Sequence, residues 1–346
     1  MQASWQSHLQ NNKAHIINDT VIDFGNPDQE TAAANTTIII TDLSHYGLLQ
    51  VSGTDAADFL QNQLSNDVRL VTPEASQLSA YCTPKGRILA SFRLFHHADG
   101  YLMQMPRPVL TPTMNRLRMF VLRSQVSLTD RSDDLVQLGL AGEGSDKLLA
   151  SCVGKIPAVV DGVCESDGLQ IIRLPDNTHR YMVLGPAEKM IALWNKLAPS
   201  ATPVGAAGWT QRDIHAGIPV IQPQTVDSFV PQMVNLHVIN GVSFKKGCYP
   251  GQEIVARMQY LGKLKRRMYL AHVQSDATVN AGDELYSAGG NTQSVGKVVE
   301  AAPTAGGGYD LLAVIQIAEL ANGDVLLHDK QGAILEFRDL PYSVAE

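Results

Sequence analysis

Apolar and polar positions along the chain follow different periods in different stretches, and each period predicts a type of element. Residues 1–36 are polar and show no clear period, so we expect a loosely attached N-terminal segment. From residue 37 onward, β-prone runs alternate with apolar stripes at helical spacing. The runs predict strands over 37–41, 46–51, 78–83, 87–95 and 101–105. The stripes predict helices over 54–67 and 110–121.

A second stretch of the chain shows a similar order of elements. Strands are predicted over 135–140, 169–174 and 181–184, and helices over 146–151 and 186–197. Each stretch thus contains a strand, a helix, two strands and a helix in that order. This repeated order resembles two ferredoxin-like units, although no residue-level repeat accompanies it.

After Arg267 the pattern becomes that of a small all-β unit with Gly-containing turns. Six short strands are predicted, over 268–273, 284–286, 294–299, 309–315, 325–327 and 334–337. We therefore predict an α+β protein in which two ferredoxin-like units precede a small C-terminal β-barrel. The predicted divisions are 1–36, 37–133, 134–262 and 263–346.

Composition narrows the class of protein. Hydrophobic residues make up 45% of the 346 residues and charged residues 18%, which is typical of a globular protein. No apolar stretch approaches the ~20 residues that span a bilayer, and no signal peptide is visible at the N-terminus. We therefore expect a cytoplasmic protein without a membrane contact. Four scattered cysteines form no CxxC pair, so we predict neither a disulfide framework nor a metal site, while a single reactive thiol remains open.

The net charge of −7 conceals two basic segments. Residues 81–131 hold eight basic and two acidic side chains, and residues 245–267 hold seven basic and one acidic. Two local concentrations of positive charge on an acidic chain indicate an anionic ligand. Ordinary solvated basic faces are the alternative, and the sequence leaves it open.

One motif stands out for its chemistry, at residues 244–257. Gly247 and Gly251 permit unusual backbone angles on both sides of Cys248. Pro250 can begin a helix that continues to residue 257, which would place the thiol just before a helix N-terminus. Two preceding lysines add positive charge, and together these features favour a reactive thiolate. A tight turn in which the cysteine only fills space is the alternative reading.

The same motif carries a resemblance to a known family. Residues 246–253 read KGCYPGQE and are similar to the K-G-C-Y-x-G-Q-E signature of the YgfZ family, which is related to the T-protein (aminomethyltransferase) of glycine cleavage. Further segments resemble the family in the same order, and the resemblance spans roughly residues 37–340. These segments are 59–61 with 66–68, 81–87, 216–219 and 229–232.

The resemblance implies a fold and a function. It implies a T-protein-like ring of three domains that binds tetrahydrofolate or another reduced folate and supports the assembly or repair of iron–sulfur enzymes, and thereby tRNA modification. It makes Cys248 the functional thiol, with Lys246 beside it as a second catalytic candidate, and it places the folate against Trp209 and Tyr46. The partners it implies are reduced folate and iron–sulfur enzymes or their assembly factors.

Two departures from the T-protein pattern bear on the activity. T-proteins carry an aspartate pair in a hairpin where residues 85–90 read Lys-Gly-Arg-Ile-Leu-Ala, so no carboxylate serves aminomethyl transfer there. T-proteins also place a pterin-binding glutamate where this chain has His215, which leaves Asp213 or Glu253 as substitutes. The prediction is a folate-binding accessory protein, and whether it is an enzyme stays open.

We expect the basic segments to bind the anionic end of a folate. The candidates to hold it are Lys85, Arg87, Lys246 and Arg257. A genuine aminomethyltransferase and a direct tRNA-binding module are the alternative functions. The acidic overall charge and the lack of a recognisable RNA-binding motif argue against direct tRNA contact.

Overall fold

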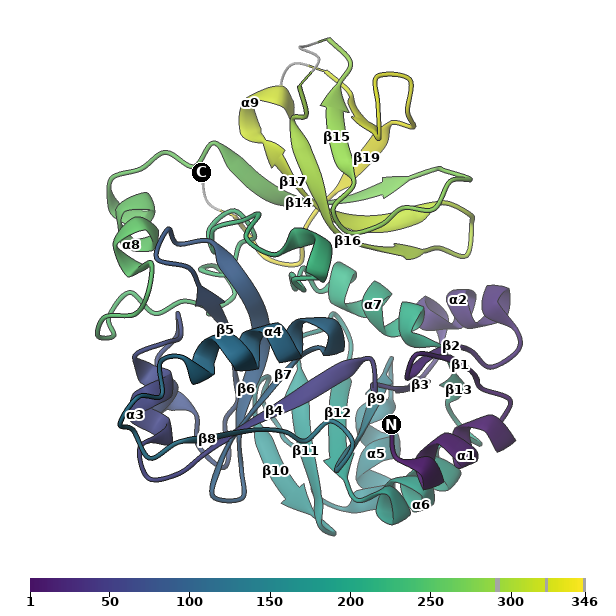
Figure 1. Cartoon of the computed structure of the whole chain (residues 1–346). Helices are drawn as coiled ribbons and strands as arrows, with labels where there is room; N and C mark the ends of the chain where they lie inside the picture. The colour runs from purple at the N-terminus through teal and green to yellow at the C-terminus, as the bar shows by residue number, and fades with distance from the viewer. Residues whose placement is uncertain (290–292, 321–322, 345–346) are drawn as a thin grey trace. The chain divides into compact units, whose positions relative to one another are not determined.

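The computed structural model describes residues 1–289, 293–320 and 323–344 (Figure 1). The chain forms two compact units, each assembled from separate stretches. The first comprises Met1–Ala56, Leu70–Gln77 and Arg93–Arg212, and the second comprises Ala57–Arg69, Leu78–Phe92 and Asp213–Glu346. The division of the chain at residues 36, 133 and 262 stays a prediction.

The first unit combines helices with antiparallel strands. Its helices are α1 (Ala3–Asn11), α2 (Pro27–Thr36), α4 (Arg107–Arg118), α5 (Ser145–Val153), α6 (Ala187–Leu197) and most of α7 (Ala206–His215). Its strands are β1 (His15–Ile17), β2 (Thr20–Asp23), β3 (Ile39–Asp42), β4 (Tyr46–Ser52), β7 (Gly100–Pro106), β8 (Ser127–Asp130), β9 (Val136–Ala141), β10 (Val163–Ser166), β11 (Leu169–Leu174), β12 (Arg180–Gly185) and β13 (Thr202–Pro203).

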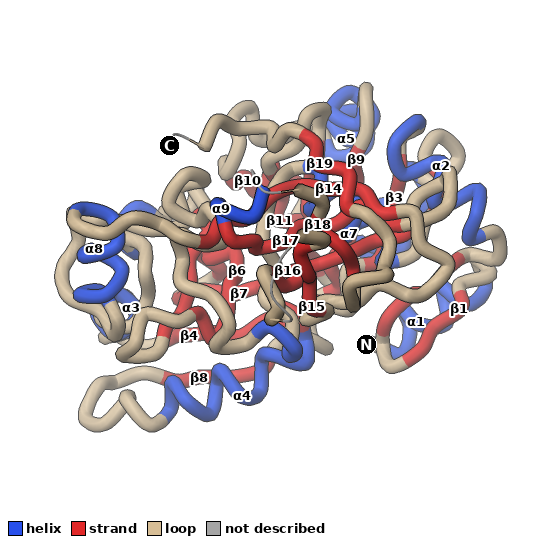
Figure 2. Tube along the Cα trace, turned by 90° about the horizontal axis from the view of Figure 1, so that it is seen from above, coloured by secondary structure: helices blue, strands red, loops and turns tan. Residues whose placement is uncertain are grey.

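A six-stranded sheet in the order β10-β11-β12-β9-β3-β13 forms the centre of the first unit. Only the short β13 runs parallel to its neighbour β3. Helices α5 and α6 pack together, and α6 contacts β9 and β12 (Figure 1). Helix α4 lies along β4 and β8, which pair with β7 in the order β7-β4-β8 (Figure 2).

The N-terminal segment is firmly attached, so the prediction of a loose segment over residues 1–36 is wrong. Trp5 and Leu9 are fully buried in the core of the first unit, where Trp5 packs edge-on against Trp194 of α6. The indole Nε1 of Trp5 donates a hydrogen bond of 2.7 Å to a carboxylate oxygen of Asp42. Two apolar residues four apart are enough to anchor α1, because one of them is a tryptophan.

The second unit contains the remaining elements. They are α3 (Ala56–Gln61), a 3₁₀ turn η1 (Val68–Leu70), β5 (Gln77–Cys82), the first half of β6 (Ile88–His97), a 3₁₀ turn η2 (Pro223–Thr225), α8 (Gln252–Tyr260), β14 (Arg266–Val273), β15 (Glu284–Ser287), β16 (Gly296–Pro303), β17 (Tyr309–Gln316), α9 (Ile317–Leu320), β18 (Val325–Leu327) and β19 (Leu335–Arg338).

The C-terminal strands form a curled half-barrel sheet in the order β18-β15-β16-β17-β14-β19 (Figure 1). All six predicted strands after Arg267 are present, and the predicted α+β class is confirmed. The helix predicted over 54–67 is shorter, since α3 ends at Gln61 and its side chain accepts a hydrogen bond from the amide of Val68. Among the described residues, no helix has the length and apolar character that crossing a membrane requires.

Candidate functional site

The loop over residues 244–251, which we call the cysteine loop, leads into α8 in the second unit. Gly251 precedes the helix with φ of 85°, so α8 begins at Gln252 and not at Pro250 as the sequence suggested. A Cβ atom on Gly251 would lie 2.4 Å from the carbonyl oxygen of Thr83 and 2.7 Å from the Cα of Gly86. Glycine is therefore required at this point, because the backbone of the hairpin at 83–87 packs directly against the start of α8.

Lys246 is buried and ties the cysteine loop to α3. Its Nζ donates hydrogen bonds to the main-chain oxygens of Gln61, Leu64 and Asn66, at 2.5, 2.6 and 3.1 Å. The ammonium also lies 5.2 Å from the ring centroid of Tyr249. Burial lowers the pKa of Lys246 to about 8. Because an ammonium has three protons and three carbonyls accept them, these contacts are those of a structural cross-link.

Two further side chains join the segment after α3 to residues 240–241, shortly before the cysteine loop. The hydroxyl of Ser65 donates to the carbonyl of Gly241 at 2.8 Å and accepts from the amide of Ala80. The side-chain amide of Asn66 donates to the carbonyls of Asn240 and Leu78, at 2.6 and 2.8 Å. The segments 59–68, 78–82 and 240–251, far apart in sequence, are thereby held as one structure.

Cys248 is the one exposed cysteine of the chain's four, all of which the structure describes. The next residue, Tyr249, is buried, and its hydroxyl finds no hydrogen-bond partner among the described residues. Burial raises the pKa of Tyr249 above its usual value and raises the pKa of the Cys82 thiol to about 12. Cys82 is therefore a protonated core thiol, whereas Cys248 is available to solvent and to reagents.

The structure brings four predicted binding residues to the same part of the second unit. Lys85 and Arg87 are exposed on the hairpin that packs against α8, and Arg87 donates to the carbonyl of Ser228 at 2.7 Å. Glu253 and Arg257 are exposed on α8 and, being four residues apart, share one face of the helix. The hairpin, the cysteine loop and α8 thus form a continuous candidate site.

The two predicted folate-stacking residues belong to the first unit. Trp209 is only 2% exposed, and the guanidinium of Arg180 lies 5.0 Å from its ring centroid. The absence of a side chain on Gly139 of β9 makes room for the ring, since a Cβ there would lie 2.5 Å from it. Gln137, two residues earlier on β9, donates to the main-chain oxygen of Tyr46, which is also buried. Both aromatic residues therefore lie beside the same face of β9.

Sequence reasoning missed a charged cluster around Asp310. This buried carboxylate accepts hydrogen bonds from His215 at 2.7 Å, His272 at 2.9 Å and Arg338 at 3.0 Å. Burial alone would raise the pKa of Asp310, but the bonds from the two histidines and the charge of Arg338 outweigh it and lower the pKa. The partners come from α7, β14 and β19, so no local pattern could have revealed the cluster.

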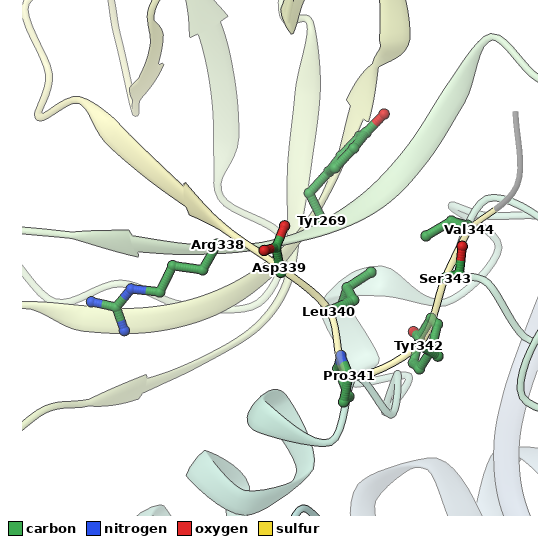
Figure 3. A pocket seen from close by; sticks show the side chains of 8 residues that line it. All are labelled: Tyr269, Arg338, Asp339, Leu340, Pro341, Tyr342, Ser343 and Val344. Atoms are coloured by element: carbon green, nitrogen blue, oxygen red, sulfur yellow. The ribbon is translucent and has the colours of Figure 1, made fainter.

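A pocket of about 490 Å³ lies next to this cluster, lined by Tyr269 and residues 338–344 (Figure 3). The hydroxyl of Tyr342 donates to the carbonyl of Gly217 at 2.7 Å and so attaches the C-terminal segment to the turn after α7. The side chains of Arg338 and Tyr269 extend in different directions (Figure 3). Polar groups do not converge in this pocket, and we assign no ligand to it.

Comparison with known sequences connects this geometry to a family. The GCVT N-terminal domain family matches residues 8–161. The tRNA-modifying protein YgfZ of Hamiltonella defensa is 34% identical over 228 residues, which cover 66% of this chain and 68% of that protein. The chain belongs to the YgfZ family. The YgfZ of Pectobacterium atrosepticum is 29% identical over 321 residues, 92% of this chain and 95% of that protein, and the Escherichia coli protein matches at the same identity.

A solved structure confirms the T-protein-like fold. The glycine cleavage system aminomethyltransferase T from Bartonella henselae superposes with a TM-score of 0.81 and covers 99% of this chain and 98% of its own. Its sequence identity is 17%, so the likeness concerns the fold alone. The YgfZ signature at residues 246–253 falls on the cysteine loop and the first turn of α8.

Proposed function

We propose that this YgfZ-family protein is a reduced-folate-binding accessory factor that acts through Cys248 in the maintenance of iron–sulfur enzymes. The observation that carries the proposal is the exposed thiol of Cys248 on a loop held in place by buried contacts. A cysteine that only filled space would lie in the core, as Cys82 does. The proposed site of action is the cytoplasm.

Tetrahydrofolate, or another reduced folate, is the ligand we propose. The aminomethyltransferase T-like fold supports this choice, and Trp209 and Tyr46 offer aromatic surfaces for a pterin. Both side chains are buried, so a ligand that stacks on either ring needs a rearrangement of its neighbours, such as Arg180 beside Trp209. Lys85, Arg87 and Arg257 remain the proposed contacts for the glutamate tail, with Glu253 a candidate for the pterin.

In this proposal Lys246 has a positioning role. Its ammonium is fully engaged by the carbonyls after α3 and therefore fixes the position of the loop that presents Cys248. A catalytic role for Lys246 stays a prediction. A positioning role accounts for a lysine two residues before the functional thiol without assigning it any proton transfer.

The alternative of a genuine aminomethyltransferase finds no support in the hairpin. Residues 85–90 contain no carboxylate, and Arg87 is engaged with main-chain oxygens of 227 and 228. Direct tRNA binding is the other alternative, and the relatives are named tRNA-modifying proteins. We propose that the effect on tRNA is indirect, through the enzymes that modify it.

Equilibrium binding to the purified protein separates these functions. We expect saturable binding of tetrahydrofolate and no tRNA binding beyond that of an unrelated acidic protein of similar size. A reconstituted glycine-cleavage assay should detect no aminomethyl transfer. Failure to bind any reduced folate would contradict the proposal, and tRNA binding without folate binding would favour the RNA-binding alternative.

A further inference from the structure

Helix α8 presents large apolar side chains to solvent next to the cysteine loop. Ile254 is 38% exposed, Tyr260 68% and Leu261 84%. Ile254 and Tyr260 belong to α8, and Leu261 follows Tyr260 directly at the C-cap of the helix. Loops flank this helix in the views of Figures 1 and 2. A group of exposed large apolar residues on a folded protein is typical of a binding surface.

The apolar residues are continuous with the site at Cys248. At one end of α8, the ring of Tyr260 meets that of Phe244 edge-on, with centroids 6.0 Å apart. At the other end, Ile254 lies against the hairpin, because a Cβ on Gly86 would be 3.1 Å from the Cβ of Ile254. The cysteine loop therefore contacts the last turn of α8, and the hairpin contacts its first turn. We use the name α8 surface for four adjoining parts of the chain. They are the exposed face of α8, the segment 261–266 that follows it, the cysteine loop and the hairpin.

Positive charge surrounds these apolar side chains. Seven exposed cations belong to the α8 surface, and the structure shows none of them in an ion pair with another described residue. They are Lys85, Arg87, Lys245, Arg257, Lys263, Lys265 and Arg266. Glu253 is the single acidic residue in the stretch 245–267. The surface thus combines exposed apolar side chains with a strong excess of positive charge.

We propose that the α8 surface docks an acidic protein and so brings Cys248 to it. This inference rests on the proposed function, because the docked protein would be the client on which the Cys248 thiol acts. Protein interfaces typically combine apolar and polar side chains in one patch, which matches this composition. Nucleic acids are bound mainly through phosphates, and a phosphate backbone offers no apolar recess for Ile254 and Leu261. The negative charge of the partner provides the attraction that the cations require.

Photo-crosslinking from the surface tests the proposal in the full-length chain. The probe is p-benzoylphenylalanine placed at Tyr260 and expressed in cells. A matched control carries the probe at Leu122, which is 87% exposed on the first unit. We expect an RNase-resistant protein adduct from Tyr260 that the Leu122 control lacks, and a crosslinked protein with a negative net charge.

The partner identified by crosslinking is then purified without the crosslink, and its affinity for the wild-type chain and for variants is measured. We expect its Kd to rise at least tenfold with the double change Tyr260→Ser and Leu261→Ser, and to rise with salt, while Leu122→Ser leaves it unchanged. Cys248→Ser should retain docking, because the thiol is not an anchor. An adduct equal to the Leu122 control, an adduct removed by RNase, a basic partner, or an unchanged Kd in the double variant would each overturn the proposal.

Failure here is distinguishable from failure of the proposed function. Tetrahydrofolate binding is measured on the same double variant, whose changes lie on the exposed side of α8. If folate binding persists while docking is absent from the wild type, only the docking proposal falls. If docking persists while the wild type binds no reduced folate, only the proposed function falls.

Discussion

Replacing Lys246 with methionine gives the sharpest test of how the cysteine loop is held. Methionine keeps part of the buried stem but leaves the main-chain oxygens of Gln61, Leu64 and Asn66 without their donor. A hydrogen bond from a charged donor contributes roughly 1.5–3 kcal/mol. The burial of the ammonium opposes the stabilisation by these three bonds. It lowers the pKa of Lys246 from 10.5 to about 8. That burial costs about 3 kcal/mol, at ~1.36 kcal/mol per pKa unit.

We therefore expect Lys246→Met to lower the free energy of unfolding by about 1.5–6 kcal/mol, the difference between these two effects. Urea unfolding of the full chain measures it, and Lys245→Met, at the exposed neighbouring lysine, is the matched control. The control should change the free energy of unfolding by less than ~0.5 kcal/mol. The cysteine loop should also become more susceptible to proteolysis in the Lys246→Met variant.

The reasoning is refuted if Lys246→Met unfolds within ~0.5 kcal/mol of the wild type, which is the range of a surface substitution. A variant that keeps its stability yet loses biological activity would instead point to a chemical role for the Lys246 ammonium. Lys246→Arg offers a further check, because a guanidinium retains the charge but does not reproduce the geometry of three convergent carbonyls.

Three further predictions concern other parts of the molecule. Gly139→Ala should lower the free energy of unfolding by about 1–3 kcal/mol, because the added methyl collides with the Trp209 ring. Thermal unfolding measures this change, and an unchanged midpoint would refute the close contact. Trp5→Ala should cost about 3–5 kcal/mol and expose residues 1–36 to protease, and a change below ~1 kcal/mol would show that α1 is dispensable. The lowered pKa of Asp310 means that its carboxylate stabilises the folded state above the unfolded pKa of about 3.9, and this contribution is lost as the pH falls through the lower folded value. The stability advantage of wild type over Asp310→Asn should therefore be full at about pH 7 and shrink below about pH 4, and an advantage independent of pH would contradict the ionic contacts.

The order of secondary-structure elements could be predicted because local periodicity determines it. The strand over 169–174 and the strand over 325–327 have the predicted bounds, since alternating or fully apolar runs end at clear turn residues. Helix α1 was missed because only Trp5 and Leu9 of its nine residues are buried, and a polar helix with so few anchors shows no stripe.

The contacts of the site were harder to predict because they join segments distant in sequence. Cys248 and its flanking glycines could be singled out from the motif, but the partners of Lys246 are main-chain carbonyls 180 to 185 residues earlier. A main-chain oxygen leaves no signature in a sequence. For the same reason, nothing local indicated that His215 would pair with Asp310, 95 residues away.

Complementation of a strain that lacks its YgfZ-family member tests the central claim, that Cys248 is the working group, most directly. The measurement compares wild type, Cys248→Ser and the half-buried control Cys152→Ser, at equal expression. Wild type and the control should restore iron–sulfur-dependent tRNA modification. Cys248→Ser should fail while its fold and its tetrahydrofolate affinity match the wild type. Full restoration by Cys248→Ser would contradict the account and leave this exposed cysteine without a function.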